Sequence, residues 1–404
     1  MRFVLVSTHI DQTTGYSKVS YNLLKQLSTL VPKIKVFHYG FQRHPQSANI
    51  RKLPTGINVY DAAANEDPKE EGFGFNKIHE YLDMVNPDIV MIYNDPLVTY
   101  RFIESMKHDP KSSTYKLWLY LDQVYEGIAQ PVMDKLRNHA DRVYCFTDYW
   151  KTKLLQYGEF KDVQILEHAV DPTIFSVLSA ENRQSIRKGL AIPNDAIVVL
   201  NANRNSQRKR LDLTIMAFAR LLKQNPDKPY YLLIATNISP QTGAYYDVPR
   251  IITRELQKVE LPIAMVQRFV LIDTAPPNVI SDDGINQLYN AADIGLNTSD
   301  GEGYGLCQLE HMYTGAPQVV TDVGSYRTFL DDSVAIFVPS IMEEYFGGAM
   351  PLGGWYPKFN PYDVAKAIEQ AAEKQVEMCQ AITKYKFKTW SSICDGLLED
   401  LLEY

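Results

Sequence analysis

Residues 196–224, AIVVLNANRNSQRKRLDLTIMAFARLLKQ, contain in order an apolar run, a basic loop and an amphipathic stretch. The run at 196–202 is almost uniformly apolar, as is typical of a parallel strand that is buried on both faces. In the stretch at 211–224, large apolar residues recur at helical spacing. A strand followed by a loop and a helix is the repeating unit of doubly wound α/β folds. The segment therefore predicts an α/β protein with a parallel sheet.

The same alternation extends in both directions from this segment. Apolar runs before it predict strands at 2–7, 34–39, 88–93, 115–121 and 142–146. Runs after it predict strands at 230–235, 268–272, 292–297 and 317–321. A polar, charged stretch that ends at Asp195 interrupts the alternation. We therefore predict two Rossmann-like doubly wound domains, at residues 1–180 and 190–384.

The composition is that of an ordinary folded protein. Of the 404 residues, 45% are hydrophobic and 22% are charged, and the length exceeds what one hydrophobic core usually serves. The formal net charge of −7 argues against a nucleic-acid partner, because nucleic-acid binders usually carry a basic excess.

The cysteines and the start of the chain bear on the compartment. The four cysteines are far apart and form no CxxC pair, which favours a reducing compartment and no structural zinc. The apolar run that opens the chain is too short for a signal sequence or a membrane span. We expect a cytoplasmic protein with no transmembrane segment. Peripheral membrane contact stays open, because a lipid-linked acceptor would not demand a span.

Ligands of open parallel sheets bind beyond the carboxyl ends of the strands, so the turns there are informative. In the turn at 7–17, STHIDQTTGYS, Gly15 would let the backbone approach a ligand, and Ser17 would cap the next helix or contact a phosphate. The turn lacks the GxGxxG pattern of dinucleotide-binding proteins. A plain loop with a capped helix is the alternative interpretation.

The loop at 203–210, NRNSQRKR, places four basic residues at the start of a helix. The amino end of a helix already carries partial positive charge, so this arrangement is unfavourable unless an anion compensates it. A diphosphate would supply that anion. The alternative is a solvated basic surface.

The turn at 297–306, NTSDGEGYGL, is the richest. Its three glycines permit tight turns and bring amide N–H groups towards a ligand at the start of the following helix. Glu302 lies on the loop and Glu310 about two turns into the helix, so the two can reach different ends of an elongated ligand. Carboxylates repel phosphates but accept hydrogen bonds from sugar hydroxyls.

The segment at 298–320, TSDGEGYGLCQLEHMYTGAPQVV, resembles the signature of family 4 of the retaining glycosyltransferases, in which seven residues separate two glutamates. The basic loop resembles that family's G-R-x-x-x-x-K segment, with Asn203 in place of the glycine. The stretches at 288–299, LYNAADIGLNTS, and 167–175, EHAVDPTIF, resemble two further motifs of the family. The likeness covers nearly all of residues 160–325 in order.

The resemblance implies the GT-B architecture, in which two Rossmann-like domains face each other across a cleft. It places acceptor recognition mostly in the first domain and donor binding mostly in the second. Arg204 and Lys209 would hold the donor diphosphate, Glu302 would bind hydroxyls of the transferred sugar, and Glu310 would bind the nucleotide ribose. We also expect the helix at about 385–404 to pack back on the first domain.

The remaining donor contacts are also implied by the resemblance. Backbone amides of the glycine-rich turn would cradle the sugar and phosphate, and Gly15 would approach the diphosphate from the other domain. The turn at Asp273 and Thr274 would lie near the base. The predicted donor-binding residues are Gly15, Arg204, Lys209, Asp273, Thr274, Glu302, Gly303, Tyr304, Gly305, Leu306 and Glu310.

The first domain departs from the family pattern. Many members carry a histidine near the reacting sugar, after the fourth or fifth strand. This chain has Asp122 at a corresponding strand end, and we take it as the candidate for that position. The predicted catalytic residues are Arg204, Lys209, Glu302 and Asp122.

The proposed chemistry needs the departing diphosphate to be neutralised, either by a metal or by fixed cations. The sequence has no D-x-D between apolar runs that would suggest a metal site, while Arg204 and Lys209 supply cations. We predict no cofactor and no divalent metal. With retention and no evident enzyme nucleophile, the acceptor hydroxyl would attack from the leaving-group side.

The predicted function is transfer of a hexose from a nucleotide sugar to a glycan, glycoprotein or glycolipid acceptor. GDP-mannose is the preferred donor, because mannosyltransferases are numerous among proteins of this kind, and a UDP-sugar is second. A nucleotide-sugar epimerase of similar fold and a non-catalytic sugar-nucleotide-binding protein are the alternatives. A glycosidase would leave the basic loop without a purpose, and an oxidoreductase would need the missing dinucleotide fingerprint. The sequence identifies neither the acceptor nor the oligomeric state.

Overall fold

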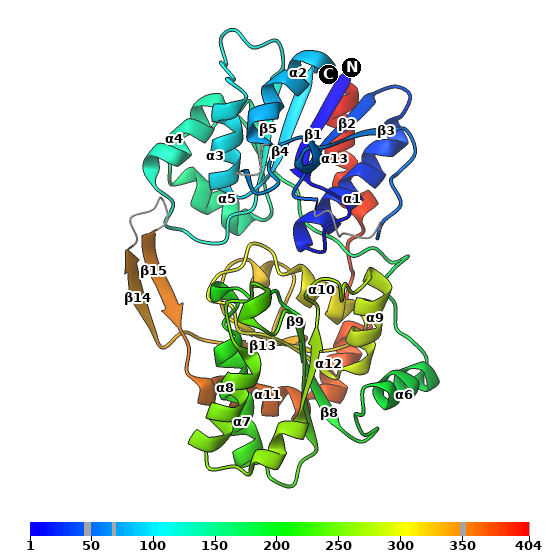
Figure 1. Ribbon diagram of the computed structural model, residues 1–404, viewed down its shortest axis with the longest axis vertical. Coiled ribbons are helices and arrows are strands. Elements are labelled where there is room, and N and C mark those ends of the chain that lie inside the picture. The colour runs from blue at the N-terminus through cyan, green and yellow to red at the C-terminus, as the bar shows by residue number, and fades with distance from the viewer. Residues whose placement is uncertain (44–49, 67–69, 348–352, 404) are drawn as a thin grey trace. The chain divides into compact units, whose positions relative to one another are not determined.

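The structure of the protein is a computed structural model, and it describes residues 1–43, 50–66, 70–347 and 353–403. The chain folds into two compact units (Figure 1). Unit 1 comprises Met1–Ala169, Phe346–Gly354 and Lys388–Tyr404, and unit 2 comprises Val170–Tyr345 and Trp355–Phe387. Each unit has its own large sheet.

The sheet of unit 1 has seven strands in the order β3-β2-β1-β4-β5-β6-β7, and every pairing is parallel. The strands are β1 (Arg2–Thr8), β2 (Lys35–Phe41), β3 (Ile57–Asp61), β4 (Ile89–Asn94), β5 (Lys116–Leu121), β6 (Arg142–Cys145) and β7 (Val163–Ile165). The helices are α1 (Gly15–Leu27), α2 (Ile78–Val85), α3 (Pro96–Ser105), α4 (Gln130–His139), α5 (Asp148–Leu155) and α13 (Trp390–Glu403). Helices α1 and α13 pack together, and α3 packs against α2 and α4.

The sheet of unit 2 has six strands in the order β10-β9-β8-β11-β12-β13, again all parallel. The strands are β8 (Ile197–Asn201), β9 (Tyr230–Thr236), β10 (Phe269–Asp273), β11 (Ile294–Asn297), β12 (Gln318–Thr321) and β13 (Ala335–Val338). The helices are α6 (Ala180–Gly189), α7 (Leu211–Gln224), α8 (Val248–Lys258), α9 (Asp282–Ala291), α10 (Leu306–Tyr313), α11 (Pro361–Glu373) and α12 (Gln375–Ile382). Helices connect most pairs of successive strands, so the predicted fold class, α/β with two doubly wound Rossmann-like domains, is confirmed.

The core of unit 2 explains why the segment at 196–224 folds as predicted. Strand β8 is buried along nearly its whole length, because helices cover both faces of the sheet. Helix α7 buries a stripe of apolar side chains and packs against α8 and α11, while α9 packs against α6 and α10 (Figure 1). Leu211, Ile215 and Phe218 of α7 lie in one continuous core with strand residues of β8 and β9.

The structure contains elements that the sequence did not predict. Strands β3, β7 and β13 lie at the edges of the two sheets. Strands β14 (Met342–Gly347) and β15 (Gly353–Lys358) form a separate two-stranded sheet. Helix α6 occupies the polar stretch that interrupts the strand and helix alternation in the sequence.

Unit 2 starts at Val170, ahead of the predicted start of the second domain at 190. The intervening segment is tied to α9, because the backbone N–H of Ser176 donates to the Asn286 side chain at 3.2 Å. The backbone N–H of Leu178 likewise donates to Asn290 at 2.8 Å. These bonds attach the segment before α6 to the second sheet and its helices.

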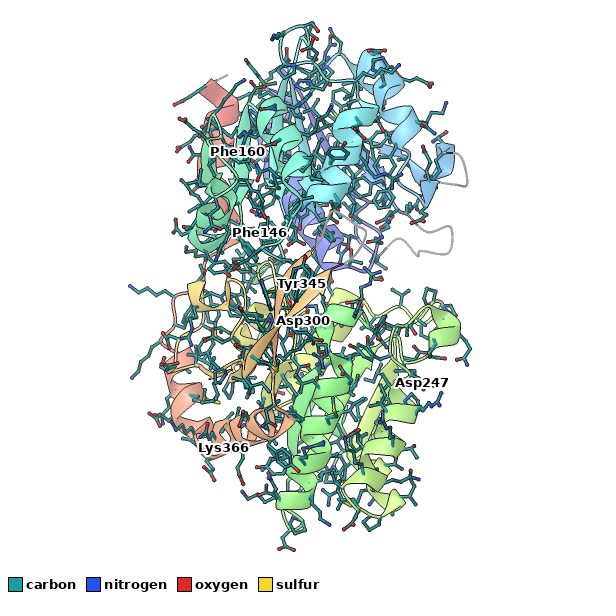
Figure 2. The ribbon with its side chains drawn as sticks, turned by 90° about the vertical axis from the view of Figure 1, so that its left-hand side faces the viewer. Phe146, Phe160, Asp247, Asp300, Tyr345 and Lys366 are labelled. Carbon is teal, nitrogen blue, oxygen red and sulfur yellow. The ribbon has the colours of Figure 1, made fainter. Side chains whose placement is uncertain are left out.

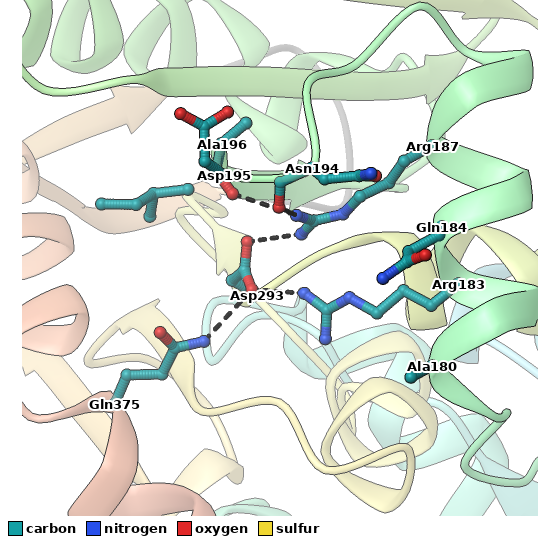
Figure 3. Close-up of a pocket in the computed structure, with 10 residues that line it drawn as sticks. Ala180, Arg183, Gln184, Arg187, Asn194, Asp195, Ala196, Asp293 and Gln375 are labelled. Atoms are coloured by element: carbon teal, nitrogen blue, oxygen red, sulfur yellow. Dashed lines mark hydrogen bonds and ion pairs between the residues drawn. The ribbon is translucent and has the colours of Figure 1, made fainter.

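Helix α6 is held to the sheet of unit 2 by a cluster of charged groups around Asp293, which directly precedes β11 (Figure 3). The Asp293 carboxylate accepts hydrogen bonds from the Val198 backbone N–H at 2.7 Å and from Arg187 at 2.7 Å. Arg183 and Gln375 contribute two further bonds. A cavity of about 310 Å³ lies beside this cluster, at the amino ends of β8 and β11.

Arg187 is the central cation of this cluster and is only 3% exposed. Besides Asp293, its guanidinium donates to the backbone carbonyls of Ala291, Asn194 and Ala196, at 2.9, 3.0 and 3.1 Å. A buried guanidinium with all these partners stabilises the junction of α6 and the sheet, and its removal leaves the carbonyls without donors.

We expect Arg187→Ala to destabilise unit 2 by about 3 kcal/mol, because truncating one partner of a buried ion pair leaves the other uncompensated. Arg183→Ala should cost less than about 1 kcal/mol, since the Arg183 side chain is 37% exposed. Equilibrium urea unfolding of the two variants measures both effects. Equal midpoints for the two variants would contradict the assignment.

No helix in the described part of the chain is both long enough and apolar enough to cross a membrane. The four cysteines are all free thiols, and Cys145 and Cys394 are buried.

Candidate functional site

The strand order of unit 2 reverses between β8 and β11. The connections that follow these two strands are the basic loop and the glycine-rich loop, which contain the residues that the sequence singled out. In open parallel sheets, ligands bind beyond the carboxyl ends of the strands at such a reversal. The topology of unit 2 therefore brings the two loops to the position expected of a binding site.

A buried ion pair joins the two loops. The Lys209 ammonium, from the short helical turn Gln207–Lys209, donates to the Glu302 carboxylate in the glycine-rich loop. Both residues are buried, at 8% and 7% exposure. Arg208 lies 3.5 Å from the same carboxylate and donates to the Gly301 carbonyl at 2.8 Å. The predicted residues Lys209 and Glu302 are thus in direct contact, with Arg208 beside them.

The two charges affect each other's proton affinity. Burial by itself would raise the pKa of Glu302, but Lys209 and Arg208 outweigh burial and lower this pKa to about 2. Burial lowers the pKa of Lys209, and the attraction of Glu302 opposes that shift. Glu302 is therefore a carboxylate at any physiological pH, and it can only accept hydrogen bonds.

Amide side chains hold the ion pair in place. Asn203 accepts a hydrogen bond from the Lys209 ammonium at 3.0 Å and another from Asn297 at 3.2 Å. Asn297, the last residue of β11, also donates to Gln308 on α10 at 2.9 Å. Ser299 donates to Asn297 at 2.6 Å and lies 3.3 Å from Glu302. The result is a buried polar network that spans β8, β11 and α10.

The two helices that start at this site lack a side-chain cap, as does α12, which begins at Gln375. Within the described residues, no side chain caps α7 or α10, while Asp247 caps α8 (Figure 2), Ser281 caps α9 and Asn360 caps α11. A helix start without a side-chain cap leaves backbone N–H groups for another acceptor. Both starts adjoin the ion pair, so this end of the unit is suited to an anion.

The glycine-rich loop is closely packed from behind. Tyr304 stacks on Phe329 with ring centroids 5.0 Å apart, and the Ser325 hydroxyl donates to the Gly303 carbonyl. Gly305 has a positive φ of 101° and is the N-cap residue of α10, whose first residue is Leu306. This packing sets the path of the predicted residues from Gly303 to Leu306.

A glycine after β12 is required for the position of Glu302. Gly324 has a φ of +58°, and a Cβ atom there would lie 2.0 Å from the backbone oxygen of Glu302. Because the obstacle is backbone, no side-chain rotation relieves the overlap. The turn after β12 therefore packs directly against the backbone of Glu302, the catalytic candidate in the glycine-rich loop.

We expect Gly324→Ala to displace the glycine-rich loop and weaken binding of any ligand at Glu302 by tenfold or more, because a contact of 2.0 Å cannot persist. Gly189→Ala is the matched control, since a Cβ atom at Gly189 meets nothing within 4 Å. Calorimetric ligand titration and thermal melting of both variants test this. Unchanged affinity in Gly324→Ala would contradict the proposed packing.

A second prediction concerns the charge of Glu302. Its pKa of about 2 lies below the ordinary value of 4.5, so the pair contributes stability above about pH 4.5 that is lost as the pH falls towards 2. In Lys209→Met the pKa of Glu302 should rise, because burial remains and the nearest cation is gone. Carboxyl ¹³C NMR titration measures this, with Glu302→Gln to assign the signal. A midpoint that stays near 2 in the variant would refute the coupling.

The other basic residues of the loop have different surroundings. Arg204 is exposed, and its side chain makes no ion pair or hydrogen bond with the described residues. Arg210 is bound to Asp212 through two hydrogen bonds of 2.9 and 3.0 Å. The structure therefore brings Lys209, but not Arg204, into contact with Glu302.

The remaining donor-side candidates lie on neighbouring elements of unit 2. Asp273 ends β10 and accepts a hydrogen bond from the Ala275 backbone at 3.0 Å, and Thr274 follows it. Glu310 is 3% exposed, and its carboxylate accepts a hydrogen bond from the Tyr289 hydroxyl at 3.0 Å. Cys307, which the sequence did not single out, lies close enough to Lys209 and Tyr289 to affect the pKa of each.

The strand order of unit 1 reverses between β1 and β4; Gly15 lies beyond β1, whereas Asp122 directly follows β5, the strand next to β4. Gly15 is exposed at the start of α1, and a Cβ atom there would meet nothing within 4 Å. Burial raises the pKa of the adjacent Tyr16, and the negative charges of Asp122 and Asp95, with a hydrogen bond to Asp122, raise it further. Asp122 thus lies beside the start of α1.

The described residues contain no group of three or more His, Cys, Asp or Glu side chains that could hold a metal ion.

The sequence missed the residues that position the ion pair. They are Arg208, Asn297, Ser299, Gln308, Gly324 and Tyr326. Asn297 and Ser299 lie in the glycine-rich turn quoted above, but polar residues after a strand have many roles. Only the fold shows that Asn297 lies next to Asn203. For Gly324, the turn signal VGS after β12 was visible, yet nothing in the sequence pointed to Glu302.

Comparison with known proteins adds findings on the sequence and on the fold. Residues 195–349 match the family described as Glycosyl transferases group 1. A D-inositol 3-phosphate glycosyltransferase of Saccharomonospora viridis is 30% identical over 214 residues, which are 52% of this chain and 47% of that protein. The chain thus spans about half the length of the curated relatives it matches.

The solved structures that cover the whole chain include the following two. Sucrose-phosphate synthase from Thermosynechococcus elongatus has a TM-score of 0.70 at 16% identity, covering 100% of this chain and 99% of that one. Anabaena Alr3699/HepE in complex with UDP and glucose has a TM-score of 0.70 at 14% identity, covering 100% of both chains. The chain has the fold of these proteins, so the predicted GT-B fold is confirmed, and residues 195–349 are similar in sequence to group 1 glycosyltransferases.

Proposed function

We propose that the protein is a glycosyltransferase that transfers a hexose from a nucleotide sugar to an acceptor hydroxyl, with retention of anomeric configuration and without a metal. The observation that carries this proposal is the buried contact between Lys209 and Glu302 at the carboxyl ends of β8 and β11. A fixed cation beside a carboxylate suits a substrate in which a diphosphate adjoins a hydroxylated sugar. The match of residues 195–349 to group 1 glycosyltransferases supports the same reaction.

The chemistry follows from the charges. As the bond between the anomeric carbon and the diphosphate oxygen breaks, negative charge grows on the leaving group, and Lys209 stabilises it together with the uncapped starts of α7 and α10. Glu302 accepts hydrogen bonds from sugar hydroxyls and, as a carboxylate, favours the oxocarbenium-like state. The acceptor oxygen forms the new bond to the anomeric carbon on the face from which the diphosphate leaves, and its proton passes to the diphosphate.

Three predicted residues outside the ion pair would bind the nucleotide part of the donor. Arg204, exposed in the basic loop, would contact the diphosphate, and Glu310 would accept hydrogen bonds from the ribose. Asp273 uses one carboxylate oxygen for its own turn, through Ala275. A carboxylate near the base favours guanine, which presents two adjacent N–H donors, over uracil. This argument, with the sequence resemblance, makes GDP-mannose the proposed donor, and the UDP-glucose of the HepE complexes is the second choice.

Unit 1 would contribute to both substrates. Gly15, at the exposed start of α1, leaves room for the diphosphate, and Asp122 beside Tyr16 is the proposed acceptor-side group. The acceptor would be a glycan, a glycoprotein or a glycolipid. We further propose a cytoplasmic location, consistent with four free thiols.

A calorimetric panel of nucleotide sugars, GDP-mannose and UDP-glucose first, tests the donor assignment. Binding is expected without added metal and in the presence of EDTA. ¹H NMR of the products with an acceptor library then reports transfer and the anomeric configuration. An isomerised donor without acceptor would indicate an epimerase, and tight binding with neither transfer nor hydrolysis would indicate a non-catalytic binding protein; either result overturns the proposal.

We expect Lys209→Ala to lower kcat about a hundredfold or more, as loss of one pre-positioned donor to developing charge typically does. The exposed Lys223→Ala is its control. Glu310→Gln should instead weaken donor binding by about 1 to 3 kcal/mol, because the amide keeps the bond from Tyr289 but binds ribose hydroxyls less well. Steady-state kinetics and calorimetry separate the two effects. Full turnover in Lys209→Ala would reject the role of that lysine.

A further inference from the structure

Unit 1 contains a pocket that the reaction proposed above does not yet use. Its volume is about 510 Å³, within the range of about 300 to 1,000 Å³ usual for small-molecule sites. It lies where β1 and β2 end, beside the loop that leads from β1 to Gly15. The described residues that line it are His9, Ile10, Asp11, Arg43, Arg51, Lys52, Leu53 and Val59.

The pocket is basic, although the whole chain carries a formal charge of −7. Its lining has three cations, Arg43, Arg51 and Lys52, against one carboxylate, Asp11. Arg43 lies 3.5 Å from Asp11 and 3.2 Å from Asp61, so its charge is compensated within the protein. Lys52 is exposed and makes no ion pair with the described residues. The local excess of positive charge favours an anionic ligand.

His9 supplies a hydrogen-bond donor inside the pocket. Its ring is 5% exposed, and Nδ1 accepts a bond from the Asp11 backbone N–H at 3.2 Å. Burial lowers its pKa, so the ring is neutral and the remaining proton is on Nε2. No described residue hydrogen-bonds Nε2. Nε2 is accessible at the pocket and can donate a hydrogen bond to an oxygen atom of a ligand.

The position of this histidine is built into the sheet. A Cβ atom at Gly40, near the end of β2, would lie 2.6 Å from the His9 ring and 2.9 Å from the His38 ring, so glycine makes room for both. The His9 backbone N–H donates to the Phe41 carbonyl at 2.9 Å, which fixes the start of the loop. The donor is therefore held by the fold and is not a mobile surface group.

Arg51 connects the pocket to the loop that precedes α1. Its guanidinium donates to the carbonyls of Ile10 and Gln12, at 2.6 and 3.1 Å, and lies 3.0 Å from the Ser17 hydroxyl. A ligand held in the pocket thus adjoins the loop that ends at Gly15. Leu53 and Val59, each 36% exposed, add an apolar wall that suits the carbon face of a sugar or polyol.

From this geometry we propose that the pocket is the acceptor site and that it binds a phosphate ester of a sugar or polyol, with the phosphate on Lys52 and His9 Nε2. This inference rests on the proposed glycosyltransferase function where it calls the ligand an acceptor, and it narrows the acceptor proposed above to one that carries a phosphate ester. The binding site itself is argued from its own residues. A phosphomonoester offers several acceptor oxygens and charge, which match one fixed donor and an excess of cations.

Calorimetry with the full chain tests the site, with glucose 6-phosphate, inorganic phosphate and glucose as probes at low ionic strength. Glucose 6-phosphate should bind at least tenfold more tightly than glucose. Lys52→Ala should raise its Kd about three- to tenfold, and His9→Ala by a similar factor. Lys33→Ala, another exposed lysine of unit 1, is the control and should change nothing. Because Lys52 is exposed, its variant keeps the test valid even if His9→Ala fails to fold.

A second arm identifies the source of the phosphate. Co-sedimentation with phosphatidylcholine vesicles, with and without phosphatidylinositol, reports whether the ester belongs to a lipid head group. Binding in either arm, weakened in Lys52→Ala, supports the inference. Equal affinity for glucose and glucose 6-phosphate without selective vesicle binding, or an effect of Lys52→Ala no larger than that of Lys33→Ala, overturns it.

The outcomes separate this inference from the proposed reaction. If glucose 6-phosphate binds and Lys52→Ala weakens it while no nucleotide sugar binds, the pocket is correct and the glycosyltransferase proposal fails. If transfer proceeds equally well to unphosphorylated sugars, with kcat/KM the same in Lys52→Ala, the reaction stands and the pocket assignment fails. The donor affinity of Lys52→Ala, measured in the same titrations, should equal that of the unmodified protein.

Discussion

The salt bridge between Lys209 and Glu302 imposes the main physical constraint on unit 2. Each group would be costly to bury alone, so the two loops that carry them must meet for either to be buried. Asn203, Asn297 and Gln308 satisfy the remaining polar atoms around the pair. Buried polar networks of this kind tolerate little displacement, because a half-satisfied network is worse than an apolar core. The loops are therefore held in one arrangement before any ligand arrives.

The sheet makes that meeting possible. Strands β8 and β11 are neighbours in parallel register, with Val199 beside Ile294 and Leu200 beside Gly295, although the chain between them makes two further strands. Asn201 and Asn297 end the two strands and bond to the loops that follow. In unit 1, Gly15 likewise follows β1 at the reversal of strand order, whereas Asp122 follows β5, the strand next to β4. The reversal therefore accounts for the position of both loops in unit 2 and of Gly15 in unit 1.

Much of the fold could be predicted from the sequence, because buried parallel strands are apolar throughout and their helices have a clear period. The edge strands β3, β7 and β13 were not predicted, because they are short or carry polar residues on one side of the sheet. Lys209 and Glu302 were identified through a resemblance, but their mutual contact was not. The exposure of Arg204 and the part played by Gln308 depend on backbone paths that no local pattern encodes. Whether Glu310 and Asp273 bind a donor stays a prediction.

Helix α13 gives the protein an unusual order of assembly. It belongs to unit 1 and packs on α1, burying Trp390, Cys394, Leu397 and Leu401, yet it follows the whole of unit 2 in the chain. On the ribosome, the amino-terminal sheet thus emerges with an apolar strip along α1 still uncovered until the second sheet has been made. The carboxyl-terminal half can close its own core in that interval. Completion of the first unit consequently waits for synthesis of the second, and a chain released before α13 leaves the apolar strip of α1 exposed.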